Sequence, residues 1–200
     1  MFLYGANGHG KVVAEIAEEN KVSIEAFIDI DFHKQVFLGY NVMHEIPSNT
    51  LDMIISIGDN MTRREIAHKN HNINYLTLSH PSANISLRTT IDKGTVIMAG
   101  VSINSGVDIG KHCIINTNSS IDHDCKIGDF AHISPNAALA GNVVVGEGTH
   151  IGLGASIIQN INIGKWCTIG AGSVILQDIP DGGVVVGNPG RVIKINSLNN

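Results

Sequence analysis

The chain has 200 residues, of which 43% are hydrophobic and 16% charged, a globular composition with room for one domain or for two small ones. Thirteen basic and eighteen acidic residues give a net charge of −5 without a basic cluster, so nucleic acid and anionic membranes are not expected as partners. We find no membrane-length apolar run and no secretory signal at Met1–Gly10, and therefore expect a cytoplasmic protein.

The first eighty residues alternate predicted strands and helices. Residues 2–4 form a predicted strand, residues 5–10 a glycine-rich turn, and residues 11–17 an amphipathic helix. The later segments are strands at 24–29, 52–57 and 73–78 and a helix at 62–69. This alternation predicts a small parallel α/β sheet, in a domain spanning residues 1–80.

The ends of these strands carry residues suited to a nucleotide. A glycine turn at the start of a helix offers free backbone N–H groups and the positive end of the helix dipole to a phosphate. Asp29 ends the second strand, where nucleotide-binding sheets place an acid that contacts ribose. A tight turn without a ligand would also explain the glycines, but Asp29 and the loop at 58–60 favour a nucleotide-bearing ligand. A full dinucleotide is less expected in only eighty residues. The candidate substrate-binding residues are Asn7, Gly8, His9, Asp29, Gly58 and Asn60.

From residue 85 to residue 175, every sixth residue is Ile, Leu or Val. A small or β-branched residue follows four places after most of them, and glycine recurs every eighteen residues at Gly110, Gly128, Gly146 and Gly164. These periods predict a solenoid of triangular cross-section over residues 81–200, in which three hexapeptides make one turn. We expect the glycines to adopt backbone conformations that other residues avoid, and the flanking segments to cover the open ends.

Cys113, Cys125 and Cys167 fall in the inward-pointing column of small residues. Their odd number and the absence of a Cys-x-x-Cys pair fit neither a disulfide framework nor a zinc site. We therefore interpret them as core residues, because a buried thiol packs as a small hydrophobic group.

His123 occupies the third place of its hexapeptide and is expected to point outward, where an imidazole serves as a base near neutral pH. Asp122 and Asp124 flank it, and the pattern alone does not decide which of them orients the ring. A solvated surface histidine is the alternative. His132 and His150 are eighteen residues apart and should stack, and for His150 we favour a ladder without chemistry. A metal site made of His123, Asp124 and His132 is disfavoured, because the corners spread these three residues over different faces.

Three segments, together with the hexapeptide array, carry a resemblance to one family. They are Tyr4–Gly10, Ile121–Cys125 and Val186–Arg191. The chain resembles bacterial sugar acetyltransferases, which include sialic acid O-acetyltransferases and N-acetyltransferases of nucleotide-linked 4-amino-4,6-dideoxy sugars. The resemblance implies an N-terminal Rossmann-like domain, a C-terminal left-handed parallel β-helix, a homotrimer, acetyl-CoA as co-substrate without a metal, and a place in cell-surface polysaccharide biosynthesis.

The resemblance also implies residue roles. His123 matches the general base and Asp124 the carboxylate that orients it, although several relatives have glutamate there. His132 matches a histidine near the acetyl thioester, and Gly141 supplies a backbone N–H to the developing oxyanion. The residues matched to the coenzyme A groove are His132, Gly141, Gly152, Gly170, Asn188, Pro189 and Arg191.

The leading hypothesis is acetyl transfer from acetyl-CoA to the C4 amine of a nucleotide-linked 4-amino-4,6-dideoxy sugar, assisted by His123. O-acetylation of a sialic acid is the alternative, and would leave the site around Asn7, His9 and Asp29 idle. A non-catalytic solenoid that binds a nucleotide sugar or serves as a scaffold is a further alternative, which the outward pair of His123 and Asp124 disfavours. Because a prism wall has no deep pocket, we expect a neighbouring subunit to enclose His123.

Overall fold

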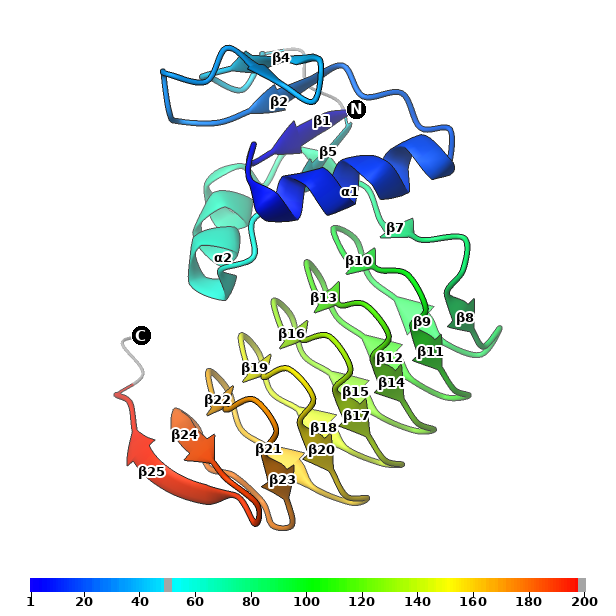
Figure 1. Ribbon diagram of the computed structural model, residues 1–200, viewed down its shortest axis with the longest axis vertical. Coiled ribbons are helices and arrows are strands. Elements are labelled where there is room, and N and C mark those ends of the chain that lie inside the picture. The colour runs from blue at the N-terminus through cyan, green and yellow to red at the C-terminus, as the bar shows by residue number, and fades with distance from the viewer. Residues whose placement is uncertain (49–51, 198–200) are drawn as a thin grey trace.

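The computed structural model describes residues 1–48 and 52–197, which form an N-terminal α/β domain and a solenoid of short strands (Figure 1). The elements of the domain are β1 (Phe2–Tyr4), α1 (Gly8–Glu19), β2 (Ala26–Ile28), β3 (Val36–Phe37), β4 (Tyr40–Met43), β5 (Asp52–Ile55), α2 (Asn60–Lys69) and β6 (Asn74–Tyr75). Its sheet has the order β3-β4-β2-β1-β5-β6, with every neighbouring pair parallel except β3 and β4. The predicted parallel α/β sheet is confirmed.

Two features of this domain differ from the sequence prediction. The hairpin of β3 and β4 was not predicted; it turns at Leu38 and Gly39, which have φ of 52° and 82°. The segment 73–78 is not one strand: β6 ends at Tyr75, and Leu78 begins β7 (Leu78–Ser79), which pairs with the solenoid strand β10. Leu78 joins the solenoid because its N–H donates to the backbone oxygen of Thr95 in the next coil.

Helix α1 follows from its sequence pattern. Val13, Ile16 and Ala17 bury one face, and the side chain of Asn7 caps the helix by accepting from the N–H groups of His9 and Gly10. Gly10 permits a close contact, because a Cβ there would overlap the carbonyl oxygen of Gly5.

The solenoid has three parallel faces. The first face contains β7, β10 (Val96–Ile97), β13 (Ile114–Ile115), β16 (His132–Ile133), β19 (His150–Ile151), β22 (Thr168–Ile169), β24 (Gly183–Val186) and the antiparallel β25 (Arg191–Ile195). The second face contains β8 (Asn84–Ile85), β11 (Ser102–Ile103), β14 (Ser120–Ile121), β17 (Ala138–Leu139), β20 (Ser156–Ile157) and β23 (Val174–Ile175). The third face contains β9 (Thr90–Ile91), β12 (Asp108–Ile109), β15 (Lys126–Ile127), β18 (Val144–Val145) and β21 (Asn162–Ile163).

The aliphatic ladder fills the axis of this column. From Ile97 to Ile175 every residue of the ladder is buried, and Ile85 and Ile91 are partly buried against it. The three cysteines are free and buried in the column of small residues. Their thiols donate to backbone carbonyls of the next coil, at Gly128, Ala140 and Pro180. The prediction of a core role for the cysteines is confirmed.

The corners of the solenoid correct the expectation about glycine. From Gly94 to Gly172, the residue three places after each inward aliphatic residue has φ between 53° and 78°, and many of these residues are Asn, Asp, His, Phe or Trp. The glycines spaced by eighteen residues are not among them. They are needed instead because coils approach closely there: a Cβ on Gly128 would lie 2.6 Å from the Glu147 nitrogen.

The N-terminal domain lies on the first face of the solenoid instead of covering an open end, contrary to our expectation (Figure 1). The outward row of this face begins with Leu78, Val96 and Ile114, which pack in one cluster with residues of α1. The row continues with His132 and His150, so its side chains become polar beyond the part of the face that packs against α1. None of the helices in the described segments is long and apolar enough to cross a membrane.

Arg63 in α2 joins the two parts. Its side chain is 1% exposed. It donates to the backbone oxygens of His112 and Phe130, at 2.7 and 2.8 Å, and to the side-chain oxygen of Asn60. Asn60 in turn donates to the Gly148 oxygen at 3.0 Å. These bonds fix the first turn of α2 against three successive coils.

Candidate functional site

His123 and Asp124 form a pair at the corner between the second and third faces. The Nδ1 atom of His123 lies 2.8 Å from Oδ2 of Asp124, and the two side chains are 59% and 68% exposed. Asp124 has φ of 60°, so the chain turns here and both side chains leave the column on the same side. The hydrogen bond to Asp124, with the charge of Asp122 added, raises the pKa of His123.

Asp122 contacts the backbone of His123 and not its ring. Its Oδ1 atom accepts from the His123 N–H at 2.8 Å and from Asn104 Nδ2 at 2.7 Å. The pattern left Asp122 and Asp124 open because an extended segment was assumed, whereas the corner is a tight turn. In this turn Asp124 contacts the imidazole, and Asp122 holds the chain beneath it.

Gly141 lies one coil further along, directly against the imidazole. A Cβ at this position would lie 2.6 Å from both Cε1 and Nε2 of His123. Its N–H makes no hydrogen bond to any other described residue, so this backbone donor is unoccupied. The absence of a side chain therefore allows the imidazole of His123 to lie directly against the Gly141 backbone.

His132 lies elsewhere, on the outward row of the first face. It borders a hollow of about 450 Å³ between α2 and the solenoid. The residues around this hollow are Gly58, Asp59, Asn60, Met61, His132, Gly148, His150, Trp166, Cys167 and Thr168. Burial lowers the pKa of His132 to about 3, and the neighbouring His150, Arg63 and His9 add to this shift. Within one chain the structure does not bring His132 to His123, because the two belong to different faces.

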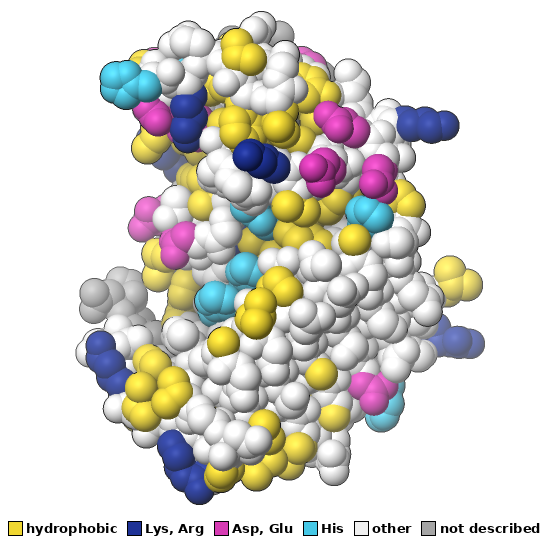
Figure 2. All heavy atoms as spheres, in the orientation of Figure 1, with side chains coloured by type: hydrophobic (Ala, Val, Ile, Leu, Met, Phe, Trp, Pro, Cys, Tyr) yellow, Lys and Arg dark blue, Asp and Glu magenta, His cyan; other side chains and the backbone are white. Residues whose placement is uncertain are grey.

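His132 and His150 form the predicted stack. Their ring centroids are 4.8 Å apart and their planes differ by 10°. The Nε2 atom of His150 lies 2.8 Å from the Ser134 hydroxyl, and burial also lowers the pKa of His150. Figure 2 shows histidine side chains gathered along the junction of the N-terminal domain and the solenoid.

The candidate substrate-binding residues meet at the carboxyl ends of β1, β2 and β5. Asn7 and Gly8 start α1, and Asp29 accepts from the Ala6 N–H and from Lys34 Nζ, both at 2.9 Å. Burial lowers the pKa of His9 to about 4, and its Nε2 atom is buried without a partner among the described residues.

The loop before α2 contributes Gly58 to the hollow, beside His132. Asn60 is 8% exposed, and its carboxamide is occupied by Gly148 and Arg63. The structure therefore gives the Asn60 side chain a role in joining the domains, which the sequence pattern did not indicate.

The residues matched to the coenzyme A groove, apart from His132 and Gly141, border the far end of the second face. Gly152 and Gly170 stack at the corner between the first and second faces, where a Cβ on Gly152 would lie 2.7 Å from the Ala171 nitrogen. Asn188 and Pro189 form a cis peptide turn, and the Gly190 N–H donates to the backbone oxygen of Val174, the first residue of β23. Arg191 is exposed.

The second face between this turn and His123 has an outward row of small residues. A shallow groove of about 330 Å³ follows the row Ser102, Ser120, Ala138 and Ser156, and Asp122 also lines it. A face without long side chains suits the extended pantetheine arm of coenzyme A, so these residues fit that co-substrate. The groove leads toward the corner that carries His123.

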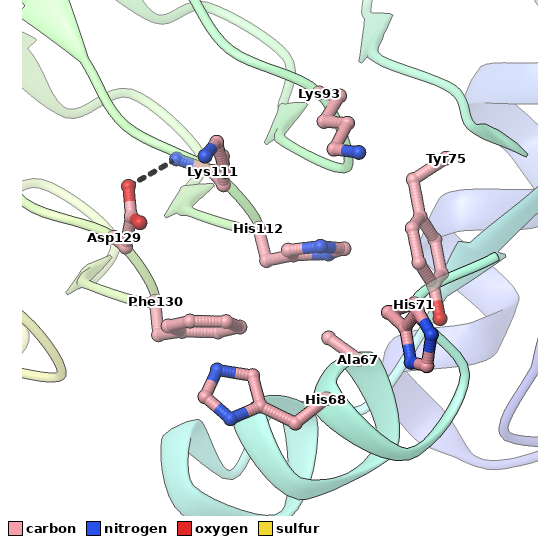
Figure 3. Close-up of a pocket in the computed structure, with 9 residues that line it drawn as sticks. All are labelled: Ala67, His68, His71, Tyr75, Lys93, Lys111, His112, Asp129 and Phe130. Carbon is pink, nitrogen blue, oxygen red and sulfur yellow. Dashed lines mark hydrogen bonds between the residues drawn. The ribbon is translucent and has the colours of Figure 1, made fainter. Parts of the chain in front are cut away.

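A second hollow, of about 380 Å³, lies between α2 and the corners of the first coils (Figure 3). His112 stacks on Phe130 with ring centroids 5.2 Å apart and planes 3° apart, and Tyr75 meets His112 edge-on at 4.5 Å. His68 and His71 of the N-terminal domain face this stack from α2 and the turn after it. This aromatic cluster packs the domain against the solenoid and does not contain His123.

Sequence reasoning missed Arg63, Asn104 and Asn116. Arg63 looks like an ordinary surface residue of a helix, and only its pairing across the domains distinguishes it. Asn104 and Asn116 occupy positions of the hexapeptide where many residue types occur, so the pattern does not distinguish them. Each precedes the residue that it contacts, Asp122 or His132, by about one turn of the solenoid. In the described part of the chain, no group of three or more His, Cys, Asp or Glu side chains is arranged to hold a metal ion.

Comparisons with known proteins give similarities over both parts of the chain. Residues 1–70 match the family described as PglD N-terminal domain. UDP-N-acetylbacillosamine N-acetyltransferase from Bacillus subtilis (strain 168) is 37% identical over 110 residues, a match that spans 48% of this chain and only half the length of that relative.

Two solved structures are similar over nearly the whole chain. A mutant of perosamine N-acetyltransferase from Caulobacter crescentus, in complex with CoA and GDP-perosamine, is 33% identical, with 96% of each chain covered and a TM-score of 0.93. The acetyltransferase domain of PglB from Neisseria gonorrhoeae FA1090 is 36% identical, with 96% of this chain and 98% of the other covered and a TM-score of 0.90.

Proposed function

Because the chain belongs to the hexapeptide-repeat family of acetyl-CoA-dependent sugar acetyltransferases, with a Rossmann-like domain and a left-handed parallel β-helix, we propose that it acetylates an amine of a nucleotide-linked sugar. The proposed acceptor is the C4 amine of a 4-amino-4,6-dideoxy sugar. The observation that carries the proposal is the exposed pair of His123 and Asp124, with the free N–H of Gly141 beside the ring.

In the proposed reaction, His123 acts as the general base. Its Nδ1–H donates to Asp124, so Nε2 is the nitrogen left to accept a proton. The neutral amine attacks the carbonyl carbon of the acetyl thioester, and Nε2 takes the proton that the amine loses as the C–N bond forms. The tetrahedral intermediate then expels the coenzyme A thiolate, the C–S bond breaks, and the thiolate takes the proton from His123.

Gly141 is proposed to stabilise the oxyanion of that intermediate. Its N–H has no partner among the described residues, and its backbone lies against the ring of His123, which supports this role for a tetrahedral carbon held at the base. Asp124 stabilises the imidazolium that forms during proton transfer. No covalent acyl-enzyme is required.

The structure supports a site shared between subunits of a homotrimer. His123 and Asp124 are more than half exposed, and neither of them lines the groove or the hollows described above. The hollow with His132, Gly58 and the nearby His9 lies on another face, and its histidines are weaker bases than His123, because their pKa values are lowered whereas that of His123 is raised. We propose that the corner of one subunit faces this hollow in the next.

The proposed binding surfaces follow from the same arrangement. The nucleotide binds at the carboxyl ends of β1 and β2, where α1 begins and Asp29 lies. The pantetheine arm follows the small-residue groove of the second face, and Arg191 lies at the turn beyond Val174, where the phosphates of coenzyme A are expected. The relatives support this choice, since a named relative is solved with CoA and GDP-perosamine.

The test is a panel of UDP- and GDP-linked 4-amino sugars incubated with the full chain and acetyl-CoA, with products read by mass. The proposal predicts one acetyl group added to an amino sugar and release of free coenzyme A. A sialic acid and a 4-hydroxy analogue of each sugar serve as controls. Acetylation of the hydroxyl substrates alone would contradict N-acetylation, and no turnover with any sugar would contradict the proposal. Sedimentation with assay tests the trimer, which an active monomer would contradict.

A further inference from the structure

The imidazole of His132 has a neighbour that restricts where its proton resides. Asn116, on the preceding coil, places Nδ2 at 3.0 Å from Nε2 of His132. The other end of the same carboxamide is also occupied: Oδ1 accepts from the Thr117 N–H at 2.8 Å and from the Thr117 hydroxyl at 3.3 Å. Asn116 is therefore held between a backbone donor and the ring.

The orientation of this carboxamide follows from chemistry. A backbone N–H can only donate, so the end of Asn116 that faces Thr117 must be the oxygen. The end that faces His132 is then the NH₂ group, which only donates. The Nε2 atom of His132 must accept this bond, so it carries no proton, and the single proton of the neutral ring is on Nδ1.

The surroundings keep this imidazole neutral and turn it toward the hollow. Burial lowers its pKa to about 3, so the ring is uncharged throughout the neutral range. The Gly58 backbone lies beside the ring as a hydrogen-bond acceptor, which opposes part of this shift and agrees with a proton on Nδ1. Both residues border the 450 Å³ hollow with Asp59. A neutral ring with its proton on Nδ1 donates a hydrogen bond without giving the proton away.

The next coil contains a matched pair that lacks this restriction. Ser134 takes the place of Asn116 eighteen residues later, and its hydroxyl lies 2.8 Å from Nε2 of His150. A hydroxyl both donates and accepts, so Ser134 allows either neutral form of His150. The two stacked rings therefore differ in one respect, namely whether an amide fixes the position of the proton.

We propose that Asn116 is a positioning residue for the acetyl transfer: held by Thr117, it fixes His132 with its proton on Nδ1. When substrate is bound, His132 then donates this hydrogen bond to a substrate oxygen in the hollow in place of the Gly58 backbone. The second half of this proposal rests on the function proposed above. The first half concerns the free protein and holds whatever the substrate is. His132 thus acts as a donor, while proton transfer belongs to His123.

Nitrogen NMR tests the position of the proton directly. The full chain is labelled with ¹⁵N-histidine, and the His132 signals are assigned by their loss in His132→Gln. At about pH 7.5, above the ordinary histidine pKa, we expect Nδ1 to resonate as a protonated nitrogen and Nε2 as an unprotonated one. The reverse assignment, averaging between the two forms, or a doubly protonated ring would each overturn the proposal.

Asn116→Asp tests the role in catalysis, because it keeps the shape and the bond from Thr117 but presents an acceptor to His132. At about pH 8.5 we expect the proton of His132 to move to Nε2 and kcat/KM to fall about 10- to 100-fold, as expected for a lost hydrogen bond to a group that gains charge. Ser134→Ala is the matched control and should leave the His132 signals unchanged. Thermal melts of each variant verify folding.

The outcomes separate the two halves of the proposal. An unchanged His132 spectrum in Asn116→Asp would overturn the assignment of Asn116, and a moved proton with unchanged kcat/KM would overturn its role in the reaction. If no amino sugar is acetylated by the unaltered protein, the proposed function fails, and the spectrum still decides the position of the proton.

Discussion

The solenoid holds histidines in two contrasting places. At the exposed corner, His123 contacts a carboxylate, which raises its pKa. On the first face, beneath the loop that precedes α2, His132 contacts a carboxamide and is buried, and its pKa falls to about 3. The two side chains lie nine residues apart, which is half of one turn of the solenoid. Their difference arises from which face each occupies and from one neighbouring side chain.

The contrast teaches that the role of a repeat residue is set by its corner or face. A residue at a corner has solvent on one side, and a carboxylate there can support a base that gains and loses a proton. A histidine buried under the N-terminal domain gains a proton only at a high cost in free energy, because the charge would be buried. Such a histidine therefore serves as a neutral hydrogen-bond donor or packs against its neighbours. The predictions below test the two environments, beginning with the largest effect.

Removal of the corner imidazole should have the largest effect. His123→Ala is expected to lower kcat by about two to four orders of magnitude, the usual contribution of a general base. Acetyl transfer to the amino sugar identified in the panel is the measurement. His33→Ala, at an exposed histidine of the N-terminal domain, is the matched control and should retain full activity. A His123→Ala protein with turnover near that of the control would remove His123 from the mechanism.

A methyl group at Gly141 should act through the same imidazole. In Gly141→Ala the new Cβ would lie 2.6 Å from Cε1 and Nε2 of His123, so the ring must move. We expect kcat to fall about 10- to 100-fold, because a displacement of about 1 Å at a catalytic group has an effect of this size. The double variant His123→Ala with Gly141→Ala separates the two roles of Gly141.

If Gly141→Ala acts only by moving the ring, the double variant should be no slower than His123→Ala alone. A further loss in the double variant would indicate that the methyl group also disturbs the N–H proposed to stabilise the oxyanion. Equal activity of Gly141→Ala and the unaltered protein would contradict both roles.

The carboxylate at the corner should set the pH dependence. The reactive form of His123 is neutral, and Asp124 raises its pKa, so activity is lost as the pH falls through that raised value. In Asp124→Asn the pKa of His123 should decrease, and the acid limb of kcat/KM should move to lower pH. We also expect about a tenfold loss of kcat on the plateau, because the amide no longer orients the ring as a charged acceptor does.

Asp122→Asn is the comparison for this variant. Its Oδ1 atom can still accept from the His123 N–H, and the contact between His123 and Asp124 is untouched. The acid limb should again move to lower pH, since a charge is removed, but kcat on the plateau should stay the same. A plateau loss in Asp122→Asn and none in Asp124→Asn would reverse the roles that the geometry assigns.

The six-residue period predicted the solenoid, because an inward-pointing aliphatic residue at every sixth position can be recognised without knowledge of distant contacts. The alternation of the first eighty residues likewise predicted the α/β sheet. The choice between Asp122 and Asp124 required the corner geometry, which depends on the positive φ of Asp124. The position of the domain on the first face was not predictable, since it depends on Arg63 reaching carbonyls 49 and 67 residues away.

The smallest effect concerns acid stability on the buried side of the comparison. Burial, with the charge of Arg63 added, lowers the pKa of His112 to about 4, whereas an unfolded histidine has a pKa of about 6.5. Between these values only the unfolded chain binds the proton, so His112 makes the protein less stable as the pH falls from about 6.5, by at most about 1.4 kcal/mol per pH unit.

His112→Phe should remove this contribution. Phenylalanine suits the position, because Phe130 occupies the equivalent corner one coil later with φ of 61° and stacks on His112. We therefore expect the unaltered protein and His112→Phe to have similar free energies of unfolding at about pH 7.5. At about pH 5 the variant should have lost less of this free energy than the unaltered protein, as measured by urea unfolding at both pH values. Parallel losses in the two proteins would show that His112 takes up its proton in the folded state.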